Sequence, residues 1–260
     1  MIDLERYPVD ALAAPRGAQI VAEGNAALRA DGVCILPGFL RGDVIDALVS
    51  ECEALAPVGH HSEVAGTPYI EAPDQSFPDG HPRRSPSRTS LTAVAYDRFP
   101  RGSALRVLYE WDPLMTFIAA LLDRPTLYRY ADPFGALNLA VMTEGDELHW
   151  HFDQTDFVVS LAIQSSTDGG DFENAKLIRS SDDEHYDDVA AVLAGMAPDR
   201  VRTEPMTPGT LMVFEGRNSM HSVTPIRRDR PRFVALLAYD TNPDTDSSDR
   251  LKIVRYGRLP

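Results

Sequence analysis

Cysteine is nearly absent from this sequence, since only Cys34 and Cys52 occur among its 260 residues. Each lies in an apolar segment, and the two form no CxxC or other metal-ligand spacing, so we expect buried free thiols. The chain also lacks any run of about 18 apolar residues, the length that spans a bilayer. Its first residues, MIDLERYPVDALAAPRG, contain early acids and no apolar stretch typical of signal peptides. These absences predict a cytoplasmic protein.

Basic residues are also scarce, with 25 Lys and Arg against 39 Asp and Glu, which gives a net charge of −14. An acidic field repels phosphate groups, so neither nucleic acid nor an anionic membrane is an expected partner. A small cationic or zwitterionic substrate is compatible with this charge, although acidity commonly serves solubility alone. The hydrophobic content of 43% is enough for a sizeable core.

The first part of the chain has helical periodicity. Apolar spacing predicts a helix over 18–30, a second over 43–56 and a third over 113–122, with a short strand in 33–40. Residues 57–88 are rich in Pro, Gly, Ser and His and have no sustained period. Loops of this length are commonly functional, so we expect a lid here.

From about residue 126 the periodicity changes to that of short strands. The runs are separated by turn residues and read TLYRYADP, ALNLAVMT, FVVSLAIQ, TLMVFEG and RFVALLAYD. One helical insertion, DDEHYDDVAAVLAGMAP, interrupts them. The pattern predicts an α+β protein with a double-stranded β-helix (jelly-roll, cupin-like) core over about 126–260. N-terminal helices from 1–125 would pack against it in a single domain, 1–260.

The residues most informative about chemistry occur in HWHFDQTDFVVSLAIQ. His151 and Asp153 are two residues apart, so on a strand both side chains point to the same face. A third metal ligand would have to come from a distant strand. His221 is well placed for this role, because it lies 221 − 151 = 70 residues later and directly follows a predicted strand.

Two histidines and one carboxylate on one face of an octahedron leave three coordination positions open. This arrangement favours non-haem iron(II) and leaves space for a chelating co-substrate and O2. Zinc stays an alternative, because affinity preferences alone do not decide between the two metals. An HxD pair by itself is usually structural, so the context of the motif carries the prediction.

An arginine opens the strand that follows the third histidine. We expect Arg232, Val234 and Leu236 to share one strand face, with Val234 and Leu236 toward the core. A guanidinium buried at the end of that face needs an anionic partner, and it binds a carboxylate as a bidentate fork. The C5 carboxylate of 2-oxoglutarate is a suitable partner. The alternative is that Arg232 is a surface residue beside its basic neighbours, Arg227, Arg228 and Arg230.

The chain resembles the iron(II)/2-oxoglutarate oxygenase superfamily in three segments, LNLAVMTEGDELHWHFDQTDFVVSLAIQ, GGDFE and PGTLMVFEGRNSMHSVTPI. Within it, the sequence is most similar to a bacterial group of radical halogenases and hydroxylases of free amino acids such as lysine. The resemblance covers residues 85–258 and is more specific for metal and cofactor than for substrate.

This resemblance implies that His151, Asp153 and His221 bind iron and that Arg232 binds 2-oxoglutarate. Asn138, on the strand before the metal motif, would donate to the other end of the co-substrate. Halogenases of this group have a small residue where this chain has Asp153, which opens a site for chloride. The carboxylate therefore favours hydroxylation, desaturation or oxidative cyclisation over halogenation.

Four further residues are candidates for substrate contacts. Arg88 resembles the position where the amino-acid halogenases hold the substrate carboxylate, and His149 has the same strand parity as His151. Asp156 and Asp132 are candidates for binding an amino group. For each of the four, a surface or structural role is an equal alternative.

The expected enzyme uses Fe(II), 2-oxoglutarate and O2, releases succinate and CO2, and attacks an unactivated C–H bond. Its expected substrate is a small molecule, with a free amino acid such as lysine or a lysine derivative first. Two alternatives stay open: a non-catalytic cupin-like metal-binding sensor or regulator, and a metal-dependent hydrolase or isomerase on the same barrel.

Overall fold

The computed structural model describes residues 1–260, and its elements follow one another in an order that separates early helices from late strands. The helices are α1 Pro15–Asp31, α2 Ile45–Leu55, α3 Ala104–Glu110, α4 Asp112–Leu121, α5 Tyr186–Leu193 and α6 Asp249–Tyr256. Short 3-10 turns are η1 Gly42–Val44, η2 Ala56–Val58, η3 Tyr96–Arg98 and η4 Pro198–Arg200. The three predicted N-terminal helices are confirmed as α1, α2 and α4. Helix α1 ends at Gly32, whose φ of 65° is the left-handed conformation that glycine adopts readily.

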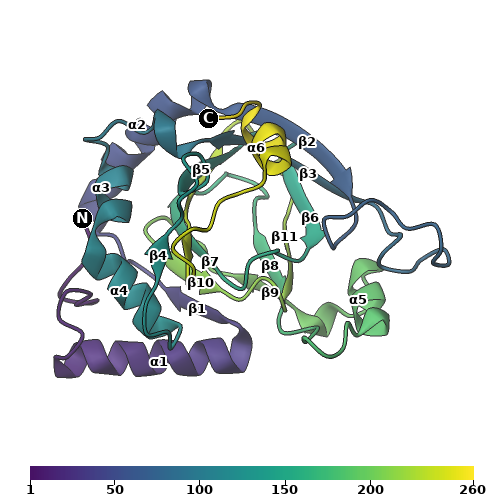
Figure 1. Cartoon of the computed structure of the whole chain (residues 1–260), viewed down its shortest axis with the longest axis horizontal. Coiled ribbons are helices and arrows are strands. Elements are labelled where there is room, and N and C mark those ends of the chain that lie inside the picture. The colour runs from purple at the N-terminus through teal and green to yellow at the C-terminus, as the bar shows by residue number, and fades with distance from the viewer.

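Eleven of the thirteen strands form one antiparallel sheet, and β4 and β13 pair separately. The order in the sheet is β1-β10-β7-β12-β5-β3-β6-β11-β8-β9, with β2 paired to β3. The strands are β1 Val33–Leu36, β2 His60–Gly66, β3 Ser87–Val94, β4 Tyr128–Arg129, β5 Leu137–Met142, β6 Glu147–His151, β7 Val158–Gln164, β8 Phe172–Ala175, β9 Val201–Glu204, β10 Leu211–Phe214, β11 Met220–Val223, β12 Arg232–Leu237 and β13 Tyr239–Asp240. The sheet curls around a central axis (Figure 1), as in a double-stranded β-helix. The predicted fold class is confirmed.

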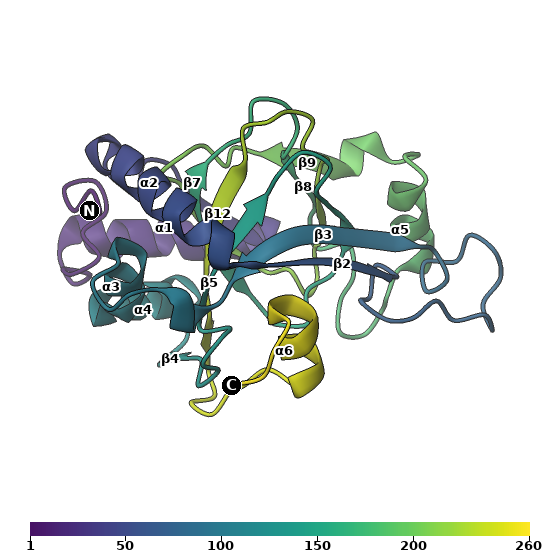
Figure 2. The same ribbon diagram turned by 90° about the horizontal axis from the view of Figure 1, so that it is seen from above.

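The outer face of the sheet is apolar where the helices pack against it. On β12, Phe233, Ala235 and Leu237 belong to the main core, a cluster of 36 buried residues that includes side chains from α1–α4. Figures 1 and 2 show these four helices together along one side of the sheet. The expectation that Val234 and Leu236 face this core is wrong, because strand alternation places them with Arg232 on the inner face.

A two-stranded arm, β2–β3, forms at the two ends of the loop expected over 57–88, so that prediction is wrong for residues 60–66 and 87–88, whereas residues 67–86 contain no helix or strand. The strands pair from His60↔Ala93 to Gly66↔Ser87, and only residues 67–86 between them are irregular. Strand β2 lies at an edge and alternates between exposed and half-buried residues. It therefore lacks the apolar alternation by which strands are recognised in a sequence. The N-terminal part thus contributes β1, β2 and β3 to the sheet, and β3 lies between β5 and β6.

The C-terminal helix α6 crosses in front of the curled sheet (Figure 1). Its Tyr256 is buried in a second cluster together with Met142, Phe214 and Val223, which lie on the inner face. Helix α6 therefore closes one end of the barrel, which we call the mouth. No helix in the structure combines the length and apolarity needed to cross a bilayer.

Candidate metal centre

Two neighbouring strands bring His151 and His221 side by side. His151 is the last residue of β6, and in the antiparallel register of β6 and β11 it lies opposite His221. The ring centroids are 4.2 Å apart. Asp153 lies two residues beyond the end of β6, and one ligand atom from each of the three residues lies within 4.8 Å of the others. The predicted triad is therefore brought together, although Asp153 is in a loop and not on the strand.

Backbone carbonyls fix which imidazole nitrogen is free in each histidine. The Nδ1 of His151 is 2.7 Å from the carbonyl oxygen of His149, and the Nδ1 of His221 is 3.1 Å from that of Ser219. A carbonyl can only accept, so both Nδ1 atoms carry the proton. Each Nε2 then keeps its lone pair for a metal ion.

The carboxylate of Asp153 has an oxygen that needs a partner. Its Oδ2 is buried, has no hydrogen bond, and lies 3.5 Å from Nε2 of His221. Gly216 makes space for it, because a Cβ on that glycine would lie 1.7 Å from Oδ2. A buried unpaired carboxylate oxygen is costly unless it binds a cation. Together with the two free Nε2 atoms it forms a donor set that fits a divalent transition metal.

Burial keeps His151 neutral. It lowers the pKa of His151 to about 4, with the neighbouring His221 as the next cause. Arg255 of α6 also lowers this pKa, whereas Asp153 raises it. At neutral pH the imidazole is therefore uncharged, which is the form that binds a metal.

Arg232 is a buried cation without a carboxylate partner. Its side chain makes a single hydrogen bond, from Nη1 to Sδ of Met142 at 3.8 Å, and only 7% of the residue is exposed. Burial lowers its pKa to about 10, and Asp171 opposes that shift. The surface alternative for Arg232 is therefore wrong. A guanidinium in this position fits a carboxylate ligand that enters the barrel.

Two asparagines on the inner face have an unsatisfied side-chain oxygen. Asn138 lies opposite Leu236 on β12, is 5% exposed, and its Oδ1 has no partner. Asn174 of β8 lies opposite His221 of β11 and also has a buried Oδ1 without a partner. Asn174 and Gly216 were not predicted from the sequence. Asn174 directly follows the motif GGDFE, which ends at Glu173, and the need for glycine at 216 depends on a close approach that spacing does not reveal.

Two of the proposed substrate contacts are placed elsewhere. The guanidinium of Arg88 pairs with Glu63 at 2.9 Å and with Glu147 at 2.6 Å. The side chain of His149 is exposed and lies 3.1 Å from Glu147. Neither side chain meets the triad, so the expectation for both is not supported by their placement. His149 serves the centre through its backbone carbonyl, which orients His151.

The two acidic candidates differ from one another. Asp132 is 1% exposed, and its Oδ2 is buried without a partner, while Oδ1 accepts from the backbone N–H of Phe134 at 2.8 Å. Asp156 is exposed and pairs with Arg217 at 2.6 Å. Burial raises the pKa of Tyr130 to about 12, and the carboxylates of Asp240, Asp132, Asp156 and Asp153 add to this shift. Only Asp132 therefore offers a free acceptor near the mouth.

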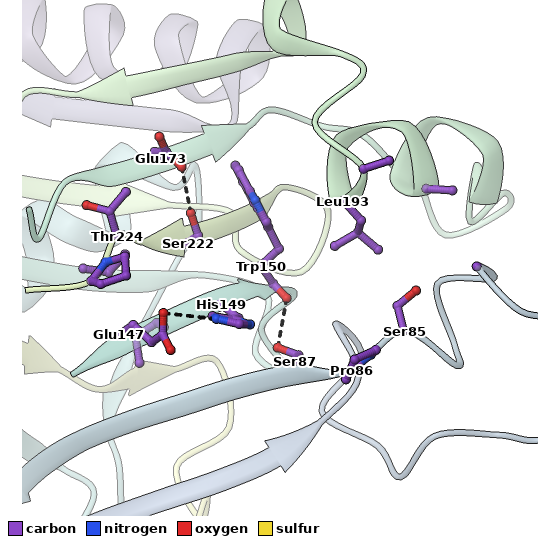
Figure 3. Close-up of a pocket in the computed structure, with 16 residues that line it drawn as sticks. Ser85, Pro86, Ser87, Glu147, His149, Trp150, Glu173, Leu193, Ser222 and Thr224 are labelled. Atoms are coloured by element: carbon purple, nitrogen blue, oxygen red, sulfur yellow. Dashed lines mark hydrogen bonds and ion pairs between the residues drawn. The ribbon is translucent and has the colours of Figure 1, made fainter. Parts of the chain in front are cut away.

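A cavity of about 660 Å3 lies on the other side of the sheet from the triad. Glu147, His149 and Trp150 line it together with Glu173 and Ser222, which are hydrogen bonded to each other (Figure 3). Ser222 and Glu173 alternate with His221 and Asn174 along their strands, so they point to the outer face. None of the three metal-ligand candidates lines this cavity.

Known proteins give three comparisons. A family model described as Halogenase D matches residues 17–252. A search of the curated proteins finds no match. Among solved structures, the chain is similar to AviO1 from Streptomyces viridochromogenes Tue57, with a TM-score of 0.57 and 17% identity over 87% of this chain and 97% of that one.

Two further solved structures have the same fold. One is an oxidoreductase of the 2OG-Fe(II) oxygenase family from Burkholderia pseudomallei, with a TM-score of 0.54 and 13% identity over 86% of this chain and 92% of that one. The other is the epimerase SnoN in complex with Fe3+, alpha ketoglutarate and nogalamycin RO. It has a TM-score of 0.57 and 15% identity over 85% of this chain and 84% of that one. At such identities the likeness shows the fold alone.

Proposed function

The chain belongs to the halogenase D family, and from that premise we propose that it is an iron(II)- and 2-oxoglutarate-dependent oxygenase of a small molecule. The observation that carries the proposal is a pair of ligand-binding groups on the inner face. Ligand atoms of His151, Asp153 and His221 converge within 4.8 Å of one another, and the buried guanidinium of Arg232 pairs with no carboxylate of the chain. A metal ion and a dicarboxylate complete both. The Fe3+ and alpha ketoglutarate bound to SnoN support the same pair of ligands here.

His151, Asp153 and His221 would hold iron(II), which with 2-oxoglutarate and O2 supplies the oxidising power to cleave an unactivated C–H bond. Hydrogen bonds from each Nδ1 to a carbonyl orient both imidazoles. The oxygen of Asp153 that lacks a hydrogen bond completes the ligand set. These three residues would supply three ligands and would leave further coordination positions for co-substrates.

Arg232 would bind the distal carboxylate of 2-oxoglutarate through its guanidinium fork. Because this guanidinium is buried, the pair would form out of water, where truncation of one partner costs about 2–5 kcal/mol. Asn138, on the inner face of the adjacent strand β5, would contact the other end of the co-substrate. Its carboxamide is buried and incompletely hydrogen bonded.

The carboxylate of Asp153 favours oxygen insertion over halogenation. In the halogenases that this chain resembles, a small residue leaves that coordination position to chloride. Here the carboxylate would hold it, so we propose hydroxylation as the reaction, with desaturation or ring closure as the other outcomes of the same hydrogen abstraction.

We further propose a free amino acid, with lysine or a lysine derivative first, as the substrate. The support is the resemblance to the amino-acid group together with the buried unpaired Oδ2 of Asp132, an acceptor suited to an ammonium group. Asp156, Arg88 and His149 are weaker candidates for substrate contacts, because ion pairs already occupy their side chains.

The test is succinate formation by the purified protein with iron(II), 2-oxoglutarate and O2. A panel of free amino acids, carrier-tethered amino acids and unrelated small molecules is screened, and products are analysed by mass spectrometry with and without chloride. We expect a product heavier by one oxygen with a free amino acid, and no chlorinated product. Failure of every condition to yield succinate contradicts the oxygenase. Succinate only with tethered or unrelated molecules contradicts the amino-acid substrate alone.

A further inference from the structure

The candidate metal ligands lie on segments that are far apart in sequence. Asp153 belongs to the loop after β6, and His221 follows the loop 215–219 that precedes β11. The two loops touch through a backbone hydrogen bond from the N–H of Asp153 to the carbonyl of Gly216, at 3.0 Å. A third segment, which follows β8 and contains Arg179, contacts both loops.

Arg179 binds the loop that leads to His221 by two hydrogen bonds. Its Nε donates to the carbonyl of Arg217 at 2.7 Å, and its backbone N–H donates to the carbonyl of Asn218 at 3.2 Å. The next carbonyl, that of Ser219, is the one that orients the imidazole of His221. Arg179 thus fixes the backbone immediately before the residue that sets the tautomer of a metal ligand.

The same guanidinium also packs against the residue between the other two ligands. The Cζ of Arg179 lies 3.9 Å from the ring centroid of Phe152, which is 1% exposed. Tyr69 stacks on Phe152 with ring centroids 5.4 Å apart, and the backbone N–H of Phe152 donates to the carbonyl of Pro68 at 2.8 Å. Phe152 is buried in a separate cluster with Tyr69 and Ile178, so holding its ring also restrains the backbone of its two neighbours, His151 and Asp153.

Glu184 restrains the guanidinium itself. Its carboxylate lies 2.9 Å from Nη1 of Arg179, and the arginine side chain is only 14% exposed. The planar fork of arginine is needed for this combination, since it donates in one direction to a carboxylate and in another to a carbonyl while its face covers a ring. An ammonium group cannot make all three contacts at once.

We propose that Arg179 is a positioning residue that holds Asp153 and His221 at ligand separation before a metal ion arrives. The inference rests on the proposed function, because it presumes that the triad binds a metal. Supporting residues around a metal centre commonly contribute 10- to 100-fold to metal affinity. Arg179 would act in this way from outside the ligand set, through Phe152 on one side and the carbonyl of Arg217 on the other.

The test compares Co(II) binding by wild type, Arg179→Met, Arg179→Lys and the control Arg83→Lys in the full-length metal-free protein. Arg83 is a matched control, because its guanidinium also pairs with Glu184 and lies 4.6 Å from the ring of Tyr69. It makes no hydrogen bond to the loop 215–219. Co(II) absorption gives both the dissociation constant and, from its d–d bands, the ligand geometry, neither of which depends on turnover.

We expect affinity to fall about tenfold or more in Arg179→Met, with altered d–d bands, and to fall less in Arg179→Lys. The affinity of Arg83→Lys for Co(II) should stay within about twofold of wild type, because this substitution removes no contact to the loops that carry the ligands. If Arg179→Met does not fold, Arg179→Lys decides the matter by the same two readouts. Wild-type affinity and bands in both Arg179 variants overturn the positioning role alone. Absence of Co(II) binding by wild type overturns the proposed function and this inference with it.

Discussion

A single methyl group at residue 216 would displace a candidate metal ligand. A Cβ there would lie 1.7 Å from the carboxylate oxygen of Asp153, far inside van der Waals contact. We predict that Gly216→Ala weakens Co(II) or Mn(II) binding at least about tenfold, as loss of supporting groups commonly does. The measurement is a metal titration of the metal-free protein.

Gly102→Ala serves as the control for that substitution, because nothing lies within 4 Å of the added Cβ. We expect it to bind metal as wild type does. Equal affinity of the Gly216→Ala variant would show that the carboxylate of Asp153 moves away freely and contributes little to the site.

A second prediction at the residue scale concerns Arg232. Its replacement should stabilise the ligand-free protein and weaken the binding of 2-oxoglutarate. Burial depresses the pKa of this base to about 10, so at every pH below that value the charged form destabilises the folded protein. We predict that Arg232→Met raises the free energy of unfolding of the ligand-free protein by on the order of 1–3 kcal/mol. The same variant should lose the stabilisation that 2-oxoglutarate gives to wild type.

Urea unfolding at neutral pH with and without 2-oxoglutarate measures both effects. Arg232→Lys is the companion variant, since it keeps the charge and loses the fork, and it should retain part of the response to 2-oxoglutarate. A response equal to that of wild type in both variants would identify another residue, such as Arg230, as the carboxylate anchor.

At the scale of elements, α6 buries two residues, Lys252 and Tyr256, and Tyr256 is the one that belongs to an apolar cluster of the barrel. Tyr256 is 6% exposed, and its ring meets that of Phe134 edge to face with centroids 5.7 Å apart. We predict that Tyr256→Ala lowers the free energy of unfolding by about 3 kcal/mol, as for other large aromatic truncations in cores.

Ile253 provides the matched control in the same helix, because it is 50% exposed. Ile253→Ala should change stability by less than about 0.5 kcal/mol. If the two variants unfold at the same urea concentration, α6 does not pack firmly on the barrel and is no closure of its mouth.

The sequence predicts these elements unequally, for physical reasons. Strands β5, β7, β10 and β12 were recognisable because they are buried and apolar, whereas the exposed edge strand β2 carries no such pattern. Strands β8 (FENA) and β9 (VRTE) also escaped, because polar residues make up half or more of each, whereas the equally short β10 (LMVF) is entirely apolar. The proximity of His151, Asp153 and His221 and the burial of Arg232 could be predicted, because they follow from the positions of these residues on or beside recognisable strands. The roles of Gly216, Asn174 and Arg179 could not be predicted, because they depend on contacts between distant loops.

At the scale of the whole molecule, the two cysteines report on global unfolding. Cys34 in β1 and Cys52 in α2 belong to the same core cluster, and both are buried. Burial raises their pKa values to about 11 and about 12, so the reactive thiolate is scarce at pH 8. We predict no reaction with a chromogenic disulfide in the native state and reaction of both thiols in concentrated guanidinium chloride.

Single Cys34→Ala and Cys52→Ala variants assign the signal to one thiol or the other. Native-state labelling should follow the fraction unfolded in denaturant for both. Rapid labelling of one thiol without denaturant would reveal local opening of β1 or α2, and would separate that element from the core.

Side chains alternate along β5, β7 and β12, so that odd positions pack in the core and even positions line the inside of the barrel. Leu137, Leu139 and Val141 serve the core between sheet and helices, while Asn138, Ala140 and Met142 line the inside of the barrel. Mutations at the second set can therefore accumulate without loosening the first. A lineage with this scaffold can therefore change the shape and polarity of the barrel interior by substitutions at alternate positions while the packing between sheet and helices is retained.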